Sequence, residues 1–182
     1  MAETPQSLKK ILAQSELIYS ENDVEAAIDQ IAAQITRDMQ DSFPIVLTVM
    51  VGAVIFSGKL LGRLSFPLEI DYVHATRYGS KTQGGQLAWL VYPRLTLKDR
   101  DILILDDIFD EGLTLKAIVE HCYASGARSV KTAVLVDKHR QRAVDFIPDY
   151  IGLKVEDRYV FGYGMDYKGY LRNVMGIYAI QD

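Results

Sequence analysis

The sequence predicts an α/β fold in which helices flank a mostly parallel, twisted β-sheet. Short apolar runs typical of buried strands alternate with segments whose apolar residues recur at helical spacing. The stretch 101–136 reads as strand, turn, helix and strand, which is typical of two parallel strands joined by a right-handed crossover. In such sheets ligands bind beyond the carboxyl ends of the strands, so the residues that follow each strand are the candidates for a site.

The predicted elements follow one another along the chain without repeats or an interdomain linker. Residues 1–20 are mixed in character and predict a peripheral arm. A helix is expected over 22–39, where apolar residues recur at helical spacing, with Asn22 or Asp23 as its cap. Further strands are expected at 45–51, 68–76, 87–92, 101–106 and 130–136, and further helices at 54–64 and 115–123.

The segment 77–86, RYGSKTQGGQ, predicts a mobile loop because it has almost no apolar residue and contains two adjacent glycines. It connects the strands expected at 68–76 and 87–92, which could therefore form an antiparallel pair. A loop of this kind can close over a site and exclude water from it.

The composition favours a cytoplasmic protein with small-molecule ligands. The net charge of −4 gives no electrostatic reason to expect a nucleic-acid partner. No apolar run has the length needed to span a bilayer, and the first ten residues lack the apolar stretch of a signal peptide, so no membrane partner is expected. The single cysteine, Cys122, cannot form an internal disulfide and is expected to be a buried core thiol.

Four carboxylates fall within six residues at the end of the strand expected at 101–106, namely Asp106, Asp107, Asp110 and Glu111. A buried strand carries such charges only at its end, where water, a metal ion or a polar ligand can compensate them. Adjacent Asp106 and Asp107 would point to opposite faces if the strand continues. Such acceptors suit ribose hydroxyls or a hydrated Mg²⁺.

The turn that follows, with Gly112, Leu113 and Thr114, enters a helix whose first backbone N–H groups would attract a phosphate. Two other interpretations stay open for the acidic turn taken alone. A pair of aspartates after a strand also occurs in phosphoacceptor receiver domains, and an acidic turn can simply cap a helix. The absence of a Walker A lysine argues against an ordinary P-loop.

The string LILDDIFDEGLTL at 103–115 closely resembles the phosphoribosyl-pyrophosphate-binding motif of type I phosphoribosyltransferases. The segments VLVDK at 134–138, PDYIG at 148–152 and DRYVFGYGMDY at 157–167 are similar to signatures of the 6-oxopurine branch of that family. The resemblance runs from about residue 45 to the C-terminus.

The resemblance implies the type I phosphoribosyltransferase fold with a small hood built from terminal segments. A single domain over 1–182 is expected, with its core at about 40–145 and its hood from the N-terminal arm and about 148–182. The implied activity is purine salvage, in which the 5-phosphoribosyl group passes from phosphoribosyl pyrophosphate to N9 of hypoxanthine or guanine, giving IMP or GMP and pyrophosphate. Mg²⁺ is the implied cofactor, and a homodimer or homotetramer is the implied assembly.

Carried over position by position, the resemblance implies a phosphoribosyl pyrophosphate site. The ribose hydroxyls would be held by Asp106 and Asp107, and the 5′-phosphate by Glu111, Gly112, Leu113 and Thr114. The pyrophosphate would meet Val51, Gly52 and Arg172, and Mg²⁺ would be held by Asp166. The mobile loop over the site would contain Arg77, Tyr78 and Gly79.

The resemblance also implies a purine site formed by Asp110, Lys138, Tyr159, Val160 and Asp166. Asp110 would be the general base at purine N7, Tyr159 would stack on the base, and the Val160 backbone would contact its edge. Lys138 is a pure hydrogen-bond donor, so it suits the O6 acceptor of a 6-oxopurine and would reject the 6-amino group of adenine. Hypoxanthine and guanine both present O6, so both are expected substrates.

The chain departs from the family pattern at two positions. The family commonly has a Leu-Lys-Gly-Gly-like turn after its first strand, with a non-proline cis peptide near pyrophosphate, and Val51 stands in the lysine position. A backbone N–H can still contact pyrophosphate there, but a side-chain cation is missing. Glu111 stands where many relatives carry threonine.

Two alternatives to hypoxanthine and guanine salvage remain. One is a xanthine-preferring enzyme with the same chemistry. The other is a non-catalytic regulator that keeps the fold as a nucleotide sensor and binds nucleic acid. The net charge of −4, and an N-terminal arm too short for a winged helix, count against the sensor.

Overall fold

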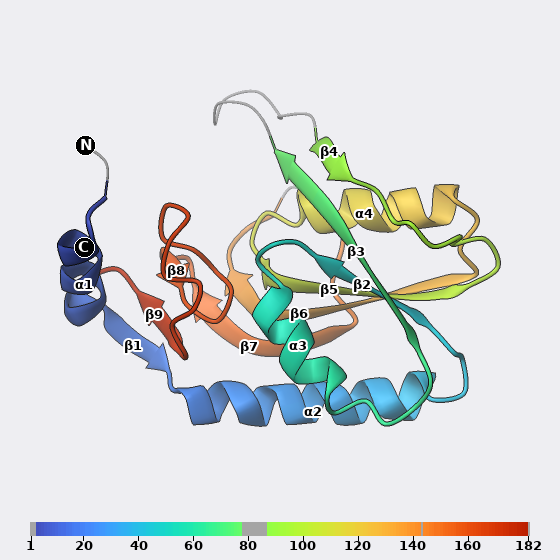
Figure 1. The fold of residues 1–182 in the computed structure, drawn as a ribbon, viewed down its shortest axis with the longest axis horizontal. Helices are drawn as coiled ribbons and strands as arrows, with labels where there is room; N and C mark the ends of the chain where they lie inside the picture. Colours follow the sequence, from blue (N-terminus) through green and yellow to red (C-terminus); the bar gives the residue numbers. More distant parts are fainter. Residues whose placement is uncertain (1–2, 78–86, 143, 182) are drawn as a thin grey trace.

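The computed structural model describes residues 3–77, 87–142 and 144–181, and it contains two β-sheets (Figure 1). The larger sheet has six strands in the order β4-β3-β2-β5-β6-β7. Its strands are β2 (Ile45–Val49), β3 (Glu69–Arg77), β4 (Leu87–Val91), β5 (Asp101–Phe109), β6 (Ser129–His139) and β7 (Tyr150–Glu156). All neighbours run parallel except β4, which pairs antiparallel with β3. The mostly parallel sheet and its antiparallel pair are therefore confirmed.

The smaller sheet joins segments from both ends of the chain, in the order β1-β9-β8. Its strands are β1 (Glu16–Tyr19), β8 (Val160–Phe161) and β9 (Ile177–Ala179), all antiparallel. It lies with helix α1 (Pro5–Gln14) at the left of Figure 1, away from the middle of the larger sheet. The expected peripheral arm is thus a helix and an edge strand.

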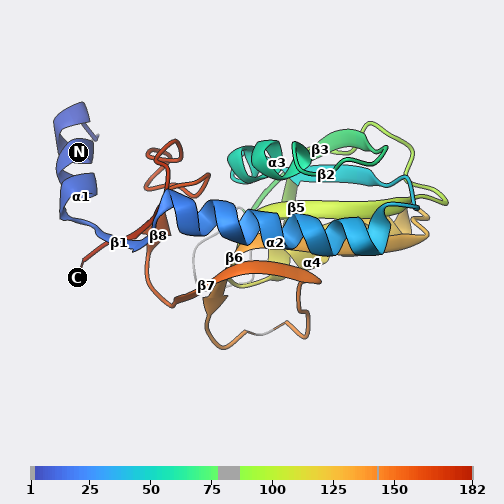
Figure 2. The ribbon, with the colours of Figure 1, turned by 90° about the horizontal axis from the view of Figure 1, so that it is seen from below.

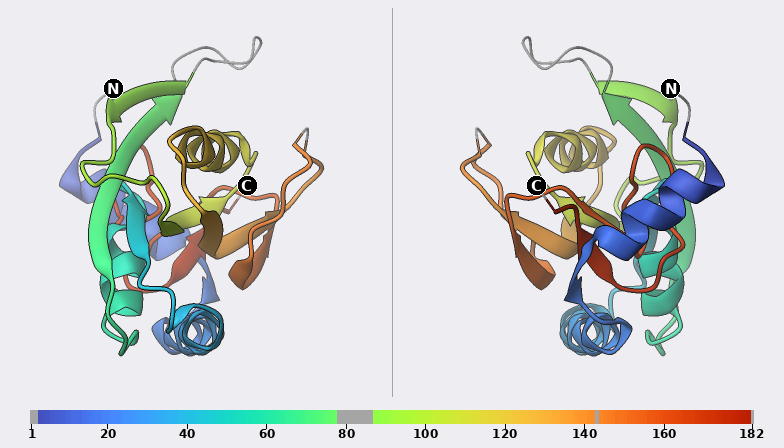
Figure 3. Two further views of the ribbon diagram at one scale, coloured as in Figure 1. Left: turned by 90° about the vertical axis from the view of Figure 1, so that its right-hand side faces the viewer. Right: turned by 90° about the vertical axis from the view of Figure 1, so that its left-hand side faces the viewer.

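Helices cover both faces of the larger sheet (Figures 2 and 3). Helices α2 (Glu21–Met39) and α3 (Val54–Leu61) lie on one face and α4 (Leu113–Ala124) on the other. Successive side chains of a strand point to opposite faces. Accordingly, Leu103 and Leu105 pack in the core beneath α2 and α3, whereas Ile102 and Ile104 pack in the core beneath α4. This explains why β5 is a continuous apolar run.

Cys122, a residue of α4, is buried in the core on that side of the sheet, as expected. Burial raises the pKa of its thiol to about 12. No helix in the described ranges is both long enough and apolar enough to cross a membrane.

The first long helix begins earlier than the sequence predicts. Ser20, and not Asn22 or Asp23, is the N-cap of α2, and its hydroxyl accepts from the Asp23 backbone N–H. The Asp23 carboxylate in turn accepts from the Ser20 backbone N–H at 2.9 Å. Asp23 is therefore the third residue of a capping box, in the place where a glutamate or glutamine is more usual.

Two other elements, helix α3 and strand β5, end at residues that differ from the predicted ones. Helix α3 ends at Leu61, three residues before its predicted end. Strand β5 continues to Phe109 because β6 pairs with it as far as Phe109 and Asp137, whereas β2 accompanies it only to Leu105. The last residues of β5 and β6 thus project as a two-stranded extension beyond the rest of the sheet.

Glu25 of α2 connects this long helix to the segment that follows β8. Tyr163 is fully buried and donates its hydroxyl to Glu25 of α2, which also pairs with Lys59 at 2.8 Å and Arg63 at 2.6 Å. Burial raises the pKa of Glu25, but the hydrogen bonds from Lys59, Tyr163 and Arg63 outweigh it and lower the pKa to about 2. Glu25 therefore remains ionised in neutral solution.

We predict opposite effects for two glycine-to-alanine substitutions. At Gly152 an added Cβ would lie 2.6 Å from the Leu135 carbonyl oxygen and 3.1 Å from Cδ1 of Ile31. Gly152→Ala should lower the free energy of unfolding by about 1–3 kcal/mol, the scale of overpacking. Gly58 lies inside helix α3 with nothing within 4 Å of an added Cβ. Gly58→Ala should raise the free energy of unfolding by about 0.5–1 kcal/mol.

Urea denaturation of both variants and the parent protein measures this. Equal effects of the two substitutions would contradict the close packing of α2 against β7.

Candidate active site

A cavity of about 440 Å³ opens at the carboxyl ends of β2 and β5. Its walls come from the turn after β2, the end of β5, the start of α4 and the C-terminal segment. The predicted residues among those that line it are Val51, Gly52, Asp106, Asp107, Asp110, Glu111, Gly112, Leu113, Thr114, Asp166 and Arg172. The cavity therefore lies where open parallel sheets bind their ligands.

The start of α4 has the features of a phosphate site. Gly112 is the N-cap with φ of 79°, and no side chain in the described structure caps the first N–H groups of the helix. An added Cβ at Gly112 would lie 2.7 Å from the Phe109 ring and 2.7 Å from the Val144 side chain, so both conformation and space require glycine. Free N–H groups at a helix start favour an anion.

Asp106 and Asp107 both line this cavity, and Asp107 also lines a second, smaller one. Strand β2 accompanies β5 only to Leu105, so both aspartates lie beyond its end. Beyond that point the cavity takes the place of a neighbouring strand. Both carboxylates are buried. Burial is the main cause that raises the pKa of Asp106 well above its usual 3.8, and repulsion from Asp107 is the second. Burial likewise raises the pKa of Asp107.

The turn after β2 packs tightly against the carboxylates and the C-terminal segment. Its Met50–Val51 peptide bond is cis, as the family resemblance implied. An added Cβ at Gly52 would lie 2.1 Å from Oδ2 of Asp107, and one at Gly164 would lie 2.0 Å from the Gly52 carbonyl oxygen. The three segments that meet here therefore leave no room for side chains on either glycine.

Arg172 supplies the positive charge of this cavity. It pairs with Asp166 at 2.8 Å and donates to the Gly164 carbonyl oxygen at 2.6 Å. Among the described lining residues it is the sole lysine or arginine, since Val51 stands in the position of the family lysine. His74 of β3 also lines the cavity, although sequence reasoning did not select it as a site residue.

A second cavity of about 180 Å³ adjoins the first, and the two share Asp107, Ile108, Asp110 and Asp166. Its further walls are Lys138, Tyr159, Val160 and Met165. Tyr159 is half exposed and donates its hydroxyl to the Asp166 carbonyl oxygen at 3.2 Å. The structure thus brings together the residues predicted to surround a planar base.

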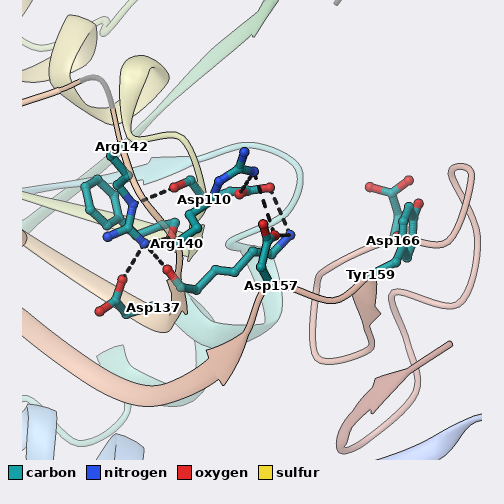
Figure 4. A network of polar contacts seen from close by, with 9 residues as sticks. Asp110, Asp137, Arg140, Arg142, Asp157, Tyr159 and Asp166 are labelled. Carbon is teal, nitrogen blue, oxygen red and sulfur yellow. Dashed lines mark hydrogen bonds and ion pairs between the residues drawn. The ribbon is translucent and has the colours of Figure 1, made fainter. Parts of the chain in front are cut away.

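Asp110 lies at the junction of the two cavities between two cations (Figure 4). Oδ2 accepts from Lys138 Nζ at 3.1 Å, and Oδ1 accepts from Arg140 Nη1 at 2.8 Å. Asp157 lies 3.8 Å from the same lysine and 3.9 Å from the same arginine. Burial raises the pKa of Asp110, but the bonds from Arg140 and Lys138 outweigh it and hold the pKa below its usual value.

Arg142 forms hydrogen bonds with the backbone at and around Asp110. Its guanidinium donates to the carbonyl oxygens of Asp110 at 2.6 Å, Phe109 at 2.9 Å and also Lys138, and it pairs with Asp137 at 2.7 Å. It also lies over the Phe109 ring, 4.2 Å from the centroid. One side chain therefore fastens the ends of β5 and β6 together.

Sequence reasoning missed Arg140, Arg142 and Asp157. The available signal was the cluster of basic residues directly after the strand that carries Lys138. Of the residues predicted for the mobile loop, Arg77 ends β3, and Tyr78 and Gly79 lie outside the described residues.

Comparison with known proteins gives concordant matches. The model of the phosphoribosyl transferase domain family matches residues 14–168. A hypoxanthine-guanine phosphoribosyltransferase of Bacillus subtilis is 34% identical over 159 residues, covering 87% of this chain and 88% of that protein. The hypoxanthine-guanine-xanthine phosphoribosyltransferase of Tritrichomonas foetus is 34% identical over 182 residues, covering 97% and 96%. A crystal structure of a Staphylococcus aureus hypoxanthine phosphoribosyltransferase matches with a TM-score of 0.89 and 27% identity, covering 98% and 97%.

The buried aspartate pair should cost stability in neutral solution. Because the folded-state pKa of Asp106 is raised above 3.8, its unfavourable effect is absent below the unfolded pKa, grows as pH rises above that value and is complete above the folded pKa. Asp106→Asn should therefore be more stable than the parent protein near pH 7, by roughly 1–3 kcal/mol, and the difference should shrink towards pH 4.

Urea denaturation across that pH range measures the effect, with exposed Asp41→Asn as the control that should change little. A stability difference that does not vary with pH would contradict the claim that the ionised carboxylate of Asp106 destabilises the folded protein.

Proposed function

The chain belongs to the phosphoribosyl transferase domain family, and we propose that it is a purine-salvage enzyme of the 6-oxopurine branch. It transfers the 5-phosphoribosyl group from phosphoribosyl pyrophosphate to N9 of hypoxanthine or guanine, with release of pyrophosphate. The curated relatives that match most of this chain carry hypoxanthine-guanine or hypoxanthine-guanine-xanthine phosphoribosyltransferase activity in their names.

The observation that carries this proposal is the contact between Lys138 and Asp110. Their Nζ and Oδ2 atoms lie 3.1 Å apart on the wall of the smaller cavity, beside Tyr159. The edge of a 6-oxopurine presents an acceptor, O6, next to a donor, N7–H. An adjacent donor and acceptor on the protein complement that edge, whereas the amino group of adenine would face the lysine donor.

The larger cavity suits phosphoribosyl pyrophosphate. The start of α4, with Glu111, Gly112, Leu113 and Thr114, would receive the 5′-phosphate through backbone N–H groups, since no side chain in the described structure caps this helix. Asp106 and Asp107 would accept from the ribose hydroxyls. Arg172 would pair with the pyrophosphate, which Val51 and Gly52 would meet through their backbone. The shared walls would bring the ribose C1′ next to the base.

The donor set of the larger cavity fits Mg²⁺ held jointly with the substrate. Mg²⁺ is commonly bound by one or two carboxylates together with phosphate and water oxygens, and the Asp166 carboxylate lines this cavity. Both oxygens of Asp166 already have partners, Arg172 at 2.8 Å and the Gly169 backbone N–H at 2.6 Å, so Asp166 would exchange one of them. When bound, Mg²⁺ would neutralise charge on the departing pyrophosphate.

In the proposed reaction Asp110 accepts the N7 proton while the N9–C1′ bond forms and the bond from C1′ to the pyrophosphate oxygen breaks. Lys138 first moves from Asp110 to purine O6, which frees Oδ2 for that proton. Tyr159 lies against the face of the base, and the Val160 backbone contacts its edge. Arg172 stabilises the negative charge that develops on the leaving group.

A homodimer or homotetramer and a cytoplasmic location stay predictions. A structural study of the Trypanosoma cruzi hypoxanthine phosphoribosyl transferase concerns the role of the C-terminal region in its oligomeric state and activity. The single-domain organisation, with a core at about 40–145 and a hood from the terminal segments, also stays a prediction.

A spectrophotometric assay tests the proposed function. The protein is mixed with Mg²⁺, phosphoribosyl pyrophosphate and, separately, hypoxanthine, guanine, xanthine and adenine. Turnover of hypoxanthine or guanine with adenine inert supports the proposal. Turnover of xanthine alone would replace it with the xanthine-preferring alternative, and nucleotide binding without turnover of any base would favour the sensor.

We predict that Asp110→Asn lowers turnover by roughly 10²-fold or more, the scale expected for loss of a general base. Binding of phosphoribosyl pyrophosphate should change less, because Asp110 faces the base at the junction of the cavities. Steady-state kinetics and direct binding measurements separate the two effects. Equal losses of turnover and binding would mean that Asp110 is a ligand contact only.

We predict that Lys138→Gln reduces kcat/KM for hypoxanthine by roughly 10-fold or more, since the charged donor to O6 is lost. The KM for phosphoribosyl pyrophosphate should stay close to that of the parent enzyme. Lys131→Gln is a suitable control, because Lys131 also lies on β6 but pairs with Asp149 away from both cavities. Unchanged use of hypoxanthine by Lys138→Gln would contradict the proposed contact with O6.

A further inference from the structure

We propose that Arg140 is a positioning residue for the transfer reaction, which holds Oδ1 of Asp110 so that Oδ2 receives the N7 proton. The inference rests on the proposed function. It assigns a role to a residue that follows β6 and that the reaction described above does not use.

Without a bound purine, both oxygens of Asp110 are occupied. Oδ2 accepts from Lys138 at 3.1 Å and Oδ1 from Arg140 at 2.8 Å, so a purine can reach the carboxylate only if one cation leaves. Lys138 is the cation that can leave for the substrate, because it lines the smaller cavity. Arg140 is not among the described residues that line either cavity, so a purine in the smaller cavity need not displace it.

The exchange would leave Asp110 with Arg140 as its remaining side-chain cation. A carboxylate that loses its single partner is free to rotate, whereas one oxygen held by a guanidinium directs the other. Arg140 would therefore preserve the direction of Oδ2 while Lys138 is on the base. The same contact would keep Asp110 ionised, and thus able to accept a proton, at the moment when the lysine departs.

The other charged groups around Asp110 do not replace this contact. Asp157 lies close to both cations, 3.8 Å from Lys138 and 3.9 Å from Arg140, and therefore competes for them. Glu111, in the same turn as Asp110, acts on Arg140 electrostatically. Arg142 donates to the backbone carbonyl oxygen of Asp110 and not to its carboxylate.

The hydrogen bond from Arg140 is the strongest influence that lowers the pKa of Asp110 against burial. Its removal should raise that pKa, although water around the partly exposed pair weakens the effect. Asp110 accepts a proton in the reaction only when it is ionised. The acid limb of the rate profile should therefore move to higher pH when Arg140 is neutralised.

The fold should tolerate the loss of Arg140, since Arg142 still fastens the Asp110 turn through the carbonyl oxygens of Phe109 and Asp110. A matched control exists at the opposite end of the same two strands. Arg128, just before β6, pairs with Asp101, the first residue of β5, just as Arg140 after β6 pairs with Asp110 after β5. Arg128→Gln removes an equivalent ion pair far from the cavities.

The test compares the parent enzyme with Arg140→Gln, Arg140→Lys and Arg128→Gln, using hypoxanthine, phosphoribosyl pyrophosphate and Mg²⁺. Single-turnover rates isolate the chemical step, and kcat/KM is measured across pH. For Arg140→Gln we expect the single-turnover rate to fall about tenfold, a fraction of the loss for removal of the base itself. The KM for phosphoribosyl pyrophosphate should stay within about twofold, and the acid limb should move to higher pH.

Arg140→Lys should recover most of the rate, because an ammonium can also pair with Oδ1, and Arg128→Gln should behave as the parent enzyme. An unchanged rate and acid limb in Arg140→Gln would overturn the inference while leaving the proposed function intact. Equal losses of rate and of phosphoribosyl pyrophosphate affinity, with no recovery in Arg140→Lys, would also overturn it and indicate a structural role. A parent enzyme that turns over no base would overturn the proposed function, and this inference with it.

Discussion

The pairing of β5 with β6 beyond the end of β2 is the constraint on which the rest of the site depends. The register aligns Phe109 with Asp137, so the next residues of the two strands, Asp110 and Lys138, come side by side. Because β2 accompanies β5 only to Leu105, the space beside this extension is open and becomes the larger cavity. Strand lengths thus decide where the carboxylates, the lysine and the helix start meet.

The carboxylates on the two sides of the site have pKa values that are shifted in opposite directions. Asp106 and Asp107 lie buried next to each other, and burial raises the pKa of each. Asp110, three residues later, lies between two cations, and its pKa is held below the usual value. In the proposed reaction the first arrangement would suit hydroxyl or metal partners that arrive with the substrate, and the second would keep a proton acceptor ionised. The site is therefore incomplete without its ligands, a feature expected where function and stability compete.

Much of this arrangement could be predicted from the sequence because local pattern and motif coincide. The apolar run of β5 ends in a carboxylate cluster, Gly112 marks the start of α4, and the order of strands and helices fixes a parallel sheet. That Asp106 and Asp107 both line the larger cavity could not be predicted, because it depends on where β2 stops. The cap of α2 was missed because Asp23 takes the third position of a capping box, which a glutamate or glutamine usually fills. Arg140 and Arg142 were missed because nothing in a cluster of basic residues states which of them turns towards Asp110.

The crystal structure of the protein with bound IMP tests the central claim most directly, namely that Lys138 and Asp110 together recognise the O6 and N7 edge of the base. We expect Lys138 Nζ within about 3.2 Å of O6, and one Asp110 carboxylate oxygen within the same distance of N7, with the base against Tyr159. A base bound with this edge turned away, or a lysine that stays on Asp110 while O6 meets another donor, would contradict the account.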